Sequence, residues 1–139
     1  MDRNAFFWKI QDGRLPQPQA ARTLGANIIS VDFDTGAIEI EFEGKEEFIN
    51  PAGKIQGGFL SAMLDDTMGP ALAATLKADE FAPTLDLHVQ FLSPAVPGKL
   101  HGVGRVVRRG GAVCFLAGEL SQGGKVVATA IATALIRKL

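Results

Sequence analysis

The stretch GGFLSAMLDDTMGPALAATL, residues 57–76, decides how this chain of 139 residues folds. It is rich in helix-forming residues. Its large apolar side chains reach around the helix instead of forming one stripe, which is typical of a helix covered on most sides. Two adjacent carboxylates, Asp65 and Asp66, interrupt this apolar run. Because a buried carboxylate without partners is costly, at least one of them needs a partner or a function.

The segments on either side of this helix have the two-residue alternation of β-strands. Residues 26–33 lead through the turn signal Asp34-Thr35-Gly36 into residues 37–44, where apolar residues alternate with glutamates. After the helix come residues 84–92, and then three runs separated by Gly-Gly turns, at 100–109, 112–120 and 125–139. The order of two strands, one long helix and four strands predicts an α+β fold. We expect a curled antiparallel sheet of about six strands around the helix.

The chain is short enough for one domain, residues 1–139. Residues 4–10, NAFFWKI, predict a short amphipathic helix that docks by Phe6, Phe7 and Trp8, so we expect a helical extension at about residues 1–20. We find no signal-peptide pattern and no apolar run long enough to span a bilayer. The single cysteine, Cys114, excludes an intramolecular disulfide and fits a buried thiol in a cytoplasmic protein.

Charge is divided unevenly along the chain. Residues 1–98 carry fourteen acidic and seven basic side chains, whereas residues 99–139 carry seven basic ones and one acid. The basic part would suit the phosphates of a ligand, or the two parts neutralise each other in the fold. The basic residues are not interleaved with aromatic ones, so we expect no nucleic-acid partner. His88 and His101 lie on separate strands without a third ligand at metal-binding spacing, which argues against a metal.

Two segments carry a family resemblance. The run Asn50-Pro-Ala-Gly-Lys-Ile-Gln-Gly-Gly58 is followed seven residues later by Asp65, and TLDLHVQFLSPAVPGKL begins with Thr84. Together they resemble the hotdog-fold acyl-CoA thioesterases of the phenylacetate-degradation (PaaI-like) type, over roughly residues 20–139. The resemblance implies a hotdog fold and hydrolysis of an acyl-CoA to free CoA and a carboxylic acid, without metal or redox cofactor.

The same resemblance implies roles for particular residues. Asp65 would be the nucleophile or the general base, Asn50 would orient the water or the thioester, and Thr84 would hold the water. The family's His before the two glycines is Gln56 here, and its amide can still donate a hydrogen bond but carries no proton. In this family the loop and the acid of one site come from different subunits, so we expect a homodimer and, beyond it, a homotetramer.

A physical argument for catalysis stands beside the resemblance. Gly57 and Gly58 open the helix, where backbone N–H groups lack partners and would stabilise a thioester oxygen that becomes negative. The alternative is that the glycines only permit a tight junction between loop and helix. Ser61 lies one turn before Asp65 and is a candidate hydrogen-bond donor to it. For Asp66 the structural interpretation is a hydrogen bond or ion pair at a subunit contact.

Other residues are candidates for holding the substrate. Phe59, Met63, Met68 and Phe81 suggest an apolar acyl pocket, although such residues usually serve the core. Arg108 and Arg109 flank a hairpin turn and are candidates for binding the phosphates of coenzyme A, although solvated turn charges are the simpler interpretation.

Two other functions stay open. A non-catalytic acyl-CoA-binding hotdog protein would bind ligand without turnover and would tolerate replacement of Asp65. A hotdog enoyl-CoA hydratase or dehydratase would need a histidine beside an acid, which His88 supplies only if it faces the site.

Overall fold

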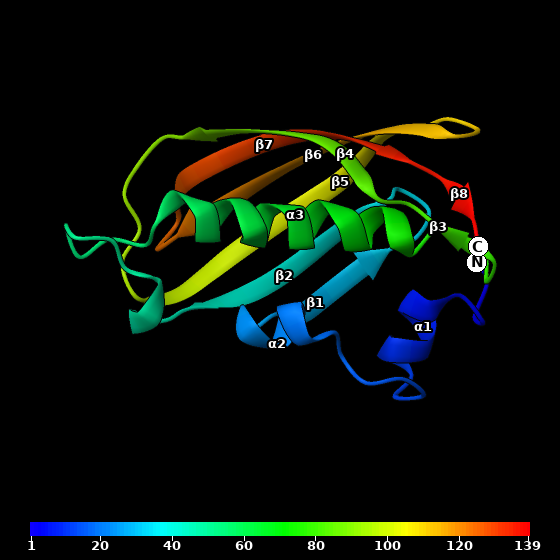
Figure 1. Ribbon diagram of the computed structural model, residues 1–139, viewed down its shortest axis with the longest axis horizontal. Coiled ribbons are helices and arrows are strands. Elements are labelled where there is room, and N and C mark those ends of the chain that lie inside the picture. The colour runs from blue at the N-terminus through cyan, green and yellow to red at the C-terminus, as the bar shows by residue number, and fades with distance from the viewer.

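The computed structural model describes residues 1–139 and shows one antiparallel sheet wrapped round one long helix (Figure 1). The α+β prediction and the six strands are confirmed. The strand order is β1-β2-β5-β6-β7-β4, so that β1 and β4 are the two edges. The strands are β1 (Asn27–Asp32), β2 (Ala37–Gly44), β4 (Thr84–Phe91), β5 (Gly98–Arg109), β6 (Val113–Gln122) and β7 (Lys125–Leu135).

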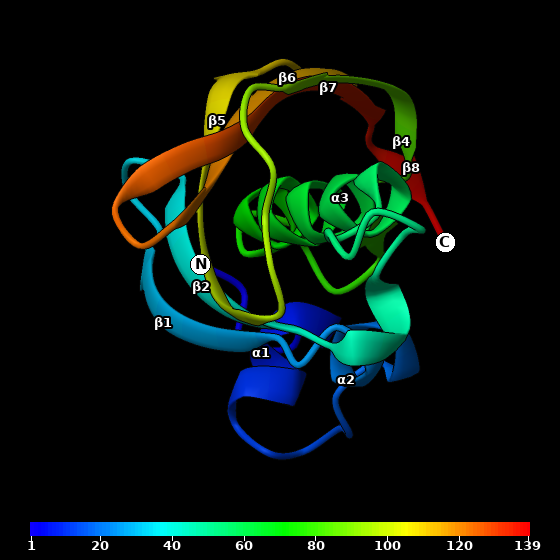
Figure 2. The ribbon, with the colours of Figure 1, turned by 90° about the vertical axis from the view of Figure 1, so that its left-hand side faces the viewer.

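The helix α3 (Gly57–Ala73) fills the concave side of this sheet, as the end-on view of Figure 2 shows. Small residues on the sheet allow the close fit. A Cβ atom at Gly102 would lie 2.6 Å from the Thr67 hydroxyl oxygen, and one at Gly104 would lie 2.9 Å from the Thr67 carbonyl oxygen. Along β7, four alanines occupy the buried positions and larger residues face outward. These are Ala128, Ala130, Ala132 and Ala134.

The N-terminal segment covers the side of α3 that faces away from the sheet (Figure 2). It contains α1 (Phe6–Gln11) and a second helix, α2 (Gln19–Thr23), that the sequence analysis did not predict. Phe7 is buried in the core, and the Trp8 indole N–H donates to the Ala74 carbonyl oxygen over 2.9 Å. α1 is thereby fixed to the C-terminal end of α3.

Short elements complete the fold. A 3-10 turn, η1 (Glu46–Phe48), precedes the loop that leads into α3. β3 (Glu80–Phe81) and β8 (Arg137–Lys138) pair as a separate two-stranded sheet beside the termini. Cys114 is free and fully buried, as predicted. No helix has both the length and the apolar character needed to cross a membrane.

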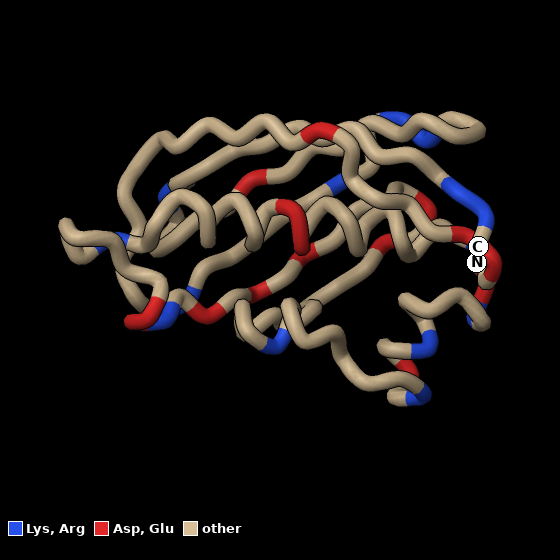
Figure 3. The backbone as a smooth tube through the Cα atoms, viewed as in Figure 1, with Lys and Arg blue, Asp and Glu red and all other residues tan.

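The uneven charge of the sequence is largely resolved within the fold. Figure 3 shows acidic residues spaced along β2 and basic residues near the β5–β6 hairpin and the C-terminus. Because β2 pairs with β5, Lys99 lies 3.3 Å from Glu41, and His101 lies 3.1 Å from Glu39. Lys138 lies 3.2 Å from Asp79. These pairs favour the interpretation that the acidic and basic parts of the chain neutralise each other. They argue against a large basic surface for phosphates.

Candidate active site

Asp65 lies at the middle of α3 and is joined to the edge strand of the sheet. The Thr84 hydroxyl at the start of β4 donates a hydrogen bond of 2.9 Å to Asp65 Oδ1. The second carboxylate oxygen has no partner within the chain and is free to accept a proton. The structure therefore brings together two residues that the sequence analysis placed in the site, although nineteen positions separate them.

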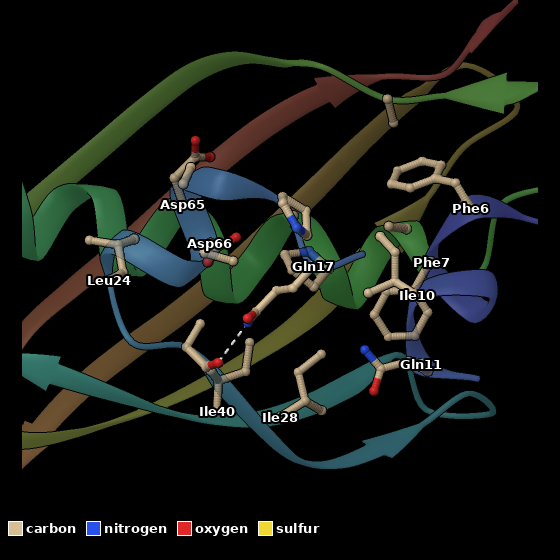
Figure 4. A pocket seen from close by; sticks show the side chains of 18 of the residues that line it. Phe6, Phe7, Ile10, Gln11, Gln17, Leu24, Ile28, Ile40, Asp65 and Asp66 are labelled. Carbon is tan, nitrogen blue, oxygen red and sulfur yellow. Dashed lines mark hydrogen bonds between the residues drawn. The ribbon is translucent and has the colours of Figure 1, made fainter. Parts of the chain in front are cut away.

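Asp66 is in a different environment from its neighbour. Figure 4 shows the Asp65 side chain pointing toward β4, whereas Asp66 faces the N-terminal segment near Gln17. No side chain or backbone group of the chain pairs with Asp66. Burial raises the pKa of Asp66 to about 6, and the nearby Asp65 charge adds to the rise. The hydrogen bond or ion pair expected for Asp66 at a subunit contact stays a prediction.

The N-terminus of α3 presents free donors. The amides of Phe59 and Leu60 both bond to the Gln56 carbonyl oxygen, whereas those of Gly57 and Gly58 have no acceptor. Gln56 is the N-cap residue, and its exposed side chain makes no capping bond. A Cβ atom at Gly57 would lie 2.9 Å from the Phe91 ring, whereas one at Gly58 would meet open space. Gly57 is therefore needed for packing, and the Gly58 amide is open to a ligand.

Asn50 shapes the loop that leads into this helix. Its side-chain oxygen accepts hydrogen bonds from the amides of Ala52 and Lys54, at 2.9 and 3.1 Å. This geometry is that of an Asx turn, the alternative role considered for Asn50. Its side-chain NH₂ group has no hydrogen-bond partner within the chain.

A cavity of about 710 Å³ opens beside the two aspartates (Figure 4). One wall is the face of α3 that carries Asp65, Asp66 and Gly69, and the opposite wall consists of residues of α1, α2 and β1. Fourteen of its twenty-four lining residues are hydrophobic, including Phe6 and Phe81. Its volume lies within the range of roughly 300–1,000 Å³ that is usual for small-molecule sites. Thr84 lines the same cavity as Asp65.

The site residues thus fall into two groups within one chain. Asn50, Gln56, Gly57 and Gly58 form a donor group at the helix N-terminus, whereas Asp65 and Thr84 form an acid group at mid-helix. Asp65 follows Gly58 by seven residues, which is about 10 Å along a helix axis. Attack on a carbonyl needs donor and acid within roughly 3 Å of the reacting atoms. One chain therefore does not bring the two groups onto one carbonyl.

Several predicted residues lie elsewhere. The Ser61 hydroxyl donates 2.9 Å to the Gly57 carbonyl oxygen and not to Asp65, because a serine in a helix readily bonds the carbonyl four residues back. Phe59 stacks on Phe48 with ring centroids 4.1 Å apart. Met68 and Met63 are fully buried in the core. None of these side chains lines the cavity; of the predicted acyl-pocket residues only Phe81 does.

The basic and histidine candidates lie outside this cavity. The Arg109 Nε–H donates 2.9 Å to the Thr75 hydroxyl oxygen and so supports the end of α3. Arg108 is exposed at the hairpin without an ion pair. His88 is opposite Ile131 on the outer face of the sheet, away from Asp65. The hydratase alternative therefore lacks its histidine.

The N-terminal wall of the cavity is the part that the sequence analysis missed. The aromatic residues of α1 were assigned to docking, and α2 was not predicted. Its five residues are too few to show a helical period. The only signal was the apolar spacing of Ala20, Ala21 and Leu24 after Pro18.

Comparison with known proteins shows the family to which the chain belongs. Residues 47–135 match the family described as "Acyl-CoA thioesterase N-terminal domain". A protein of Saccharolobus solfataricus whose name calls it a candidate esterase is 31% identical over 114 residues, which cover 81% of this chain and 79% of that protein.

Solved structures are also similar. A phenylacetic acid degradation-related protein from Ralstonia eutropha is 45% identical with a TM-score of 0.92, and the match covers 94% of this chain and 98% of that one. The PaaI protein of the E. coli phenylacetic acid degradation operon has a TM-score of 0.81 at 21% identity, covering 96% and 93% of the two chains, which supports the fold alone. The chain described here therefore belongs to the acyl-CoA thioesterases of the hotdog fold.

Proposed function

We propose that this protein hydrolyses an acyl-CoA thioester at a site shared by two copies of the chain, with Asp65 as the acid group's essential carboxylate. The observation that carries the proposal is the Thr84–Asp65 hydrogen bond of 2.9 Å between two residues that line a cavity of about 710 Å³. Family membership supports thioester hydrolysis in general, and the geometry supports these residues.

The shared site follows from the spacing along α3. Asp65 is the central residue of the helix, and Gly57 is its first. A second α3 packed antiparallel would bring the partner's donor group toward Asp65. Gly58 and Ala62 are exposed on α3 and leave room for this close approach of a second helix.

The edge strand β4 supports the same arrangement. β4 has one unpaired edge, and Leu85 and Phe91 are 60% and 54% exposed. Such an edge is a template for a second strand. If two β4 strands pair antiparallel along their whole length, Thr84 lies opposite Phe91 of the second copy. Because the Phe91 ring packs on Gly57, this register places each donor group beside an acid group.

The proposed reaction uses water and no metal or redox cofactor. The Thr84 hydroxyl oxygen accepts a hydrogen bond from the attacking water and so holds it in place. Asp65 Oδ2 then removes a proton from this water. The resulting hydroxide attacks the thioester carbon, and the oxygen that becomes negative is stabilised by the Gly58 amide, with Gln56 and Asn50 as further donors. The C–S bond then breaks, and the CoA sulfur takes up the proton. Direct attack by Asp65 on the thioester carbon is the alternative route: it expels the CoA thiolate and forms a mixed anhydride, and solvent ¹⁸O enters the Asp65 carboxylate when water then attacks this anhydride at the Asp65 carboxyl carbon.

The acyl group is proposed to be apolar, since the cavity beside Asp65 is mostly apolar. Aryl-acetyl groups are the first candidates, because the 45% identical relative is named for phenylacetic acid degradation.

Arg108 is the remaining candidate for the phosphates of CoA. We also propose a cytoplasmic location, in keeping with the free thiol of Cys114.

The test is release of CoA from a panel of aryl-acetyl and straight-chain acyl-CoAs by wild type and by Asp65→Asn. The proposal predicts turnover by wild type and a loss of at least about 10³-fold in kcat in the variant, with fold and mass unchanged. Wild-type binding without turnover of any thioester would overturn it in favour of the binding protein.

A further inference from the structure

We infer that the N-terminal segment, residues 6–24, is a specificity element: it encloses the acyl group in the cavity along α3, and Phe6 and Phe81 at the far end limit the length of that group. The inference rests on the proposed thioesterase function and adds the substrate's size to it.

The cavity begins at the acid group and extends toward the end of α3. Its helix wall includes Asp65, Gly69 and Ala73, which lie on one side at spacings of four residues, and Ala62, Asp66 and Pro70 also line it. Gly69 and Ala73, which follow Asp65 along this wall, are small, so the helix leaves space beside them. A Cβ atom at Gly69 would have no neighbour within 4 Å. A chain attached to a thioester at Asp65 therefore has an open path along the helix.

The opposite wall is held in place at both ends. At one end the Trp8 indole bonds to Ala74 over 2.9 Å, and the Ala78 amide bonds to Asp2 over 2.8 Å. At the other, the Gln17 amide donates 2.8 Å to the Ala26 carbonyl oxygen, a bond visible in Figure 4, and Leu24 is buried. The segment between these anchors is a fixed wall of the cavity and not a loose tail.

Two aromatic rings line the cavity at the end away from Asp65. The ring centroids of Phe6 and Phe81 are 6.2 Å apart with the planes tilted by 44°. Phe6 comes from α1 and Phe81 from β3, so this end of the cavity joins segments that are remote in sequence. From Asp65 to Ala73 the helix rises about 12 Å. An extended chain advances about 1.2 Å per bond, so about ten bonds fill this length.

Two substitutions should change the length of acyl chain that the cavity accepts, in opposite directions. Phe81→Ala opens the far end, and we expect the ratio of kcat/KM for palmitoyl-CoA to that for decanoyl-CoA to rise at least about tenfold. Gly69→Leu fills the path about 6 Å beyond Asp65. We expect it to lower kcat/KM for decanoyl-CoA at least about tenfold while butyryl-CoA hydrolysis changes less than about twofold. Retained butyryl-CoA turnover shows that fold and assembly are intact.

The control is Ile29→Ala, which removes an exposed apolar side chain of β1 that does not line the cavity and should leave both ratios unchanged. Chain-length ratios that stay constant in both Phe81→Ala and Gly69→Leu would overturn the inference even if the wild type is a good thioesterase. Binding of a non-hydrolysable thioether analogue of decanoyl-CoA, measured by calorimetry, tests the acyl-binding cavity separately from thioester hydrolysis. Binding lost in Gly69→Leu supports the acyl site even if no thioester is turned over; binding unchanged contradicts it.

Discussion

Two neighbouring carboxylates of α3, Asp65 and Asp66, lie in different environments. Asp65 accepts a hydrogen bond from Thr84, whereas Asp66 is half-buried and has no side-chain partner. Burial, with the adjacent Asp65 charge, raises the pKa of Asp66 from 3.8 to about 6. If α3 had only a structural role, apolar residues in place of both aspartates would make the protein more stable. The pair therefore marks the functional face of α3.

Asp66 therefore predicts a pH dependence of stability. Between pH 3.8 and about 6 the native Asp66 holds a proton that the unfolded chain releases, so its contribution to stability falls as the pH rises. Asp66→Asn removes this loss. We expect the variant to be more stable than wild type at pH 8 by up to about 3 kcal/mol, and no more stable at pH 4. Urea unfolding at both pH values measures this, and a difference independent of pH would contradict it.

At the scale of elements, the N-terminus of α3 is set by its two glycines. Gly57 is required by the Phe91 ring, and Gly58 keeps a free amide in open space. Proline is tolerated in the first turn of a helix but has no N–H. Gly58→Pro should therefore lower kcat by about 10²–10³-fold, with unfolding temperature nearly unchanged.

The matched control at this position is Gly58→Ala, which keeps the amide and adds a methyl group where no atom lies within 4 Å. It should retain most of the wild-type kcat. Equal losses in the alanine and proline variants, measured by steady-state CoA release, would show that the Gly58 amide is not the donor.

The elements of the fold were largely predictable from local patterns. The alternation of Ile38, Ile40 and Phe42 with glutamates defined β2, and the Gly-Gly pairs defined the hairpins of β5, β6 and β7. What the pattern lacked was pairing at a distance: β4 pairs with β7 and not with the strand that follows it.

The site was predictable in part for the same reason. Asp65 and Thr84 came from the family spacing, and the structure joins them. Ser61 was misassigned because a hydroxyl in a helix has two acceptors in reach, the carboxylate one turn ahead and the carbonyl one turn back, and spacing does not choose between them. The cavity wall depends on how residues 6–24 fold back onto α3, which no local period encodes.

At the scale of the whole molecule, the outer face of the sheet carries an apolar patch. Phe115 and Ile131 are 47% and 60% exposed on neighbouring strands, with Val103, Val107 and Val113 also exposed. Exposed apolar patches of this kind mark protein contacts. We expect this face to join two dimers into the tetramer. The double variant Phe115→Lys, Ile131→Lys should then be a dimer by light scattering, with kcat retained because the patch lies away from Asp65. An unchanged mass would contradict this assignment.

Complementation between two inactive variants shows whether the active site is built from two chains. Asp65→Asn lacks the acid group and Gly58→Pro lacks the donor group, so each alone should release little CoA. After the two are mixed, unfolded and refolded together, half of the dimers are mixed and each holds one intact site, so activity should recover to about one quarter of wild type. No recovery, with mixed dimers demonstrated by mass spectrometry, would contradict a site built from two chains.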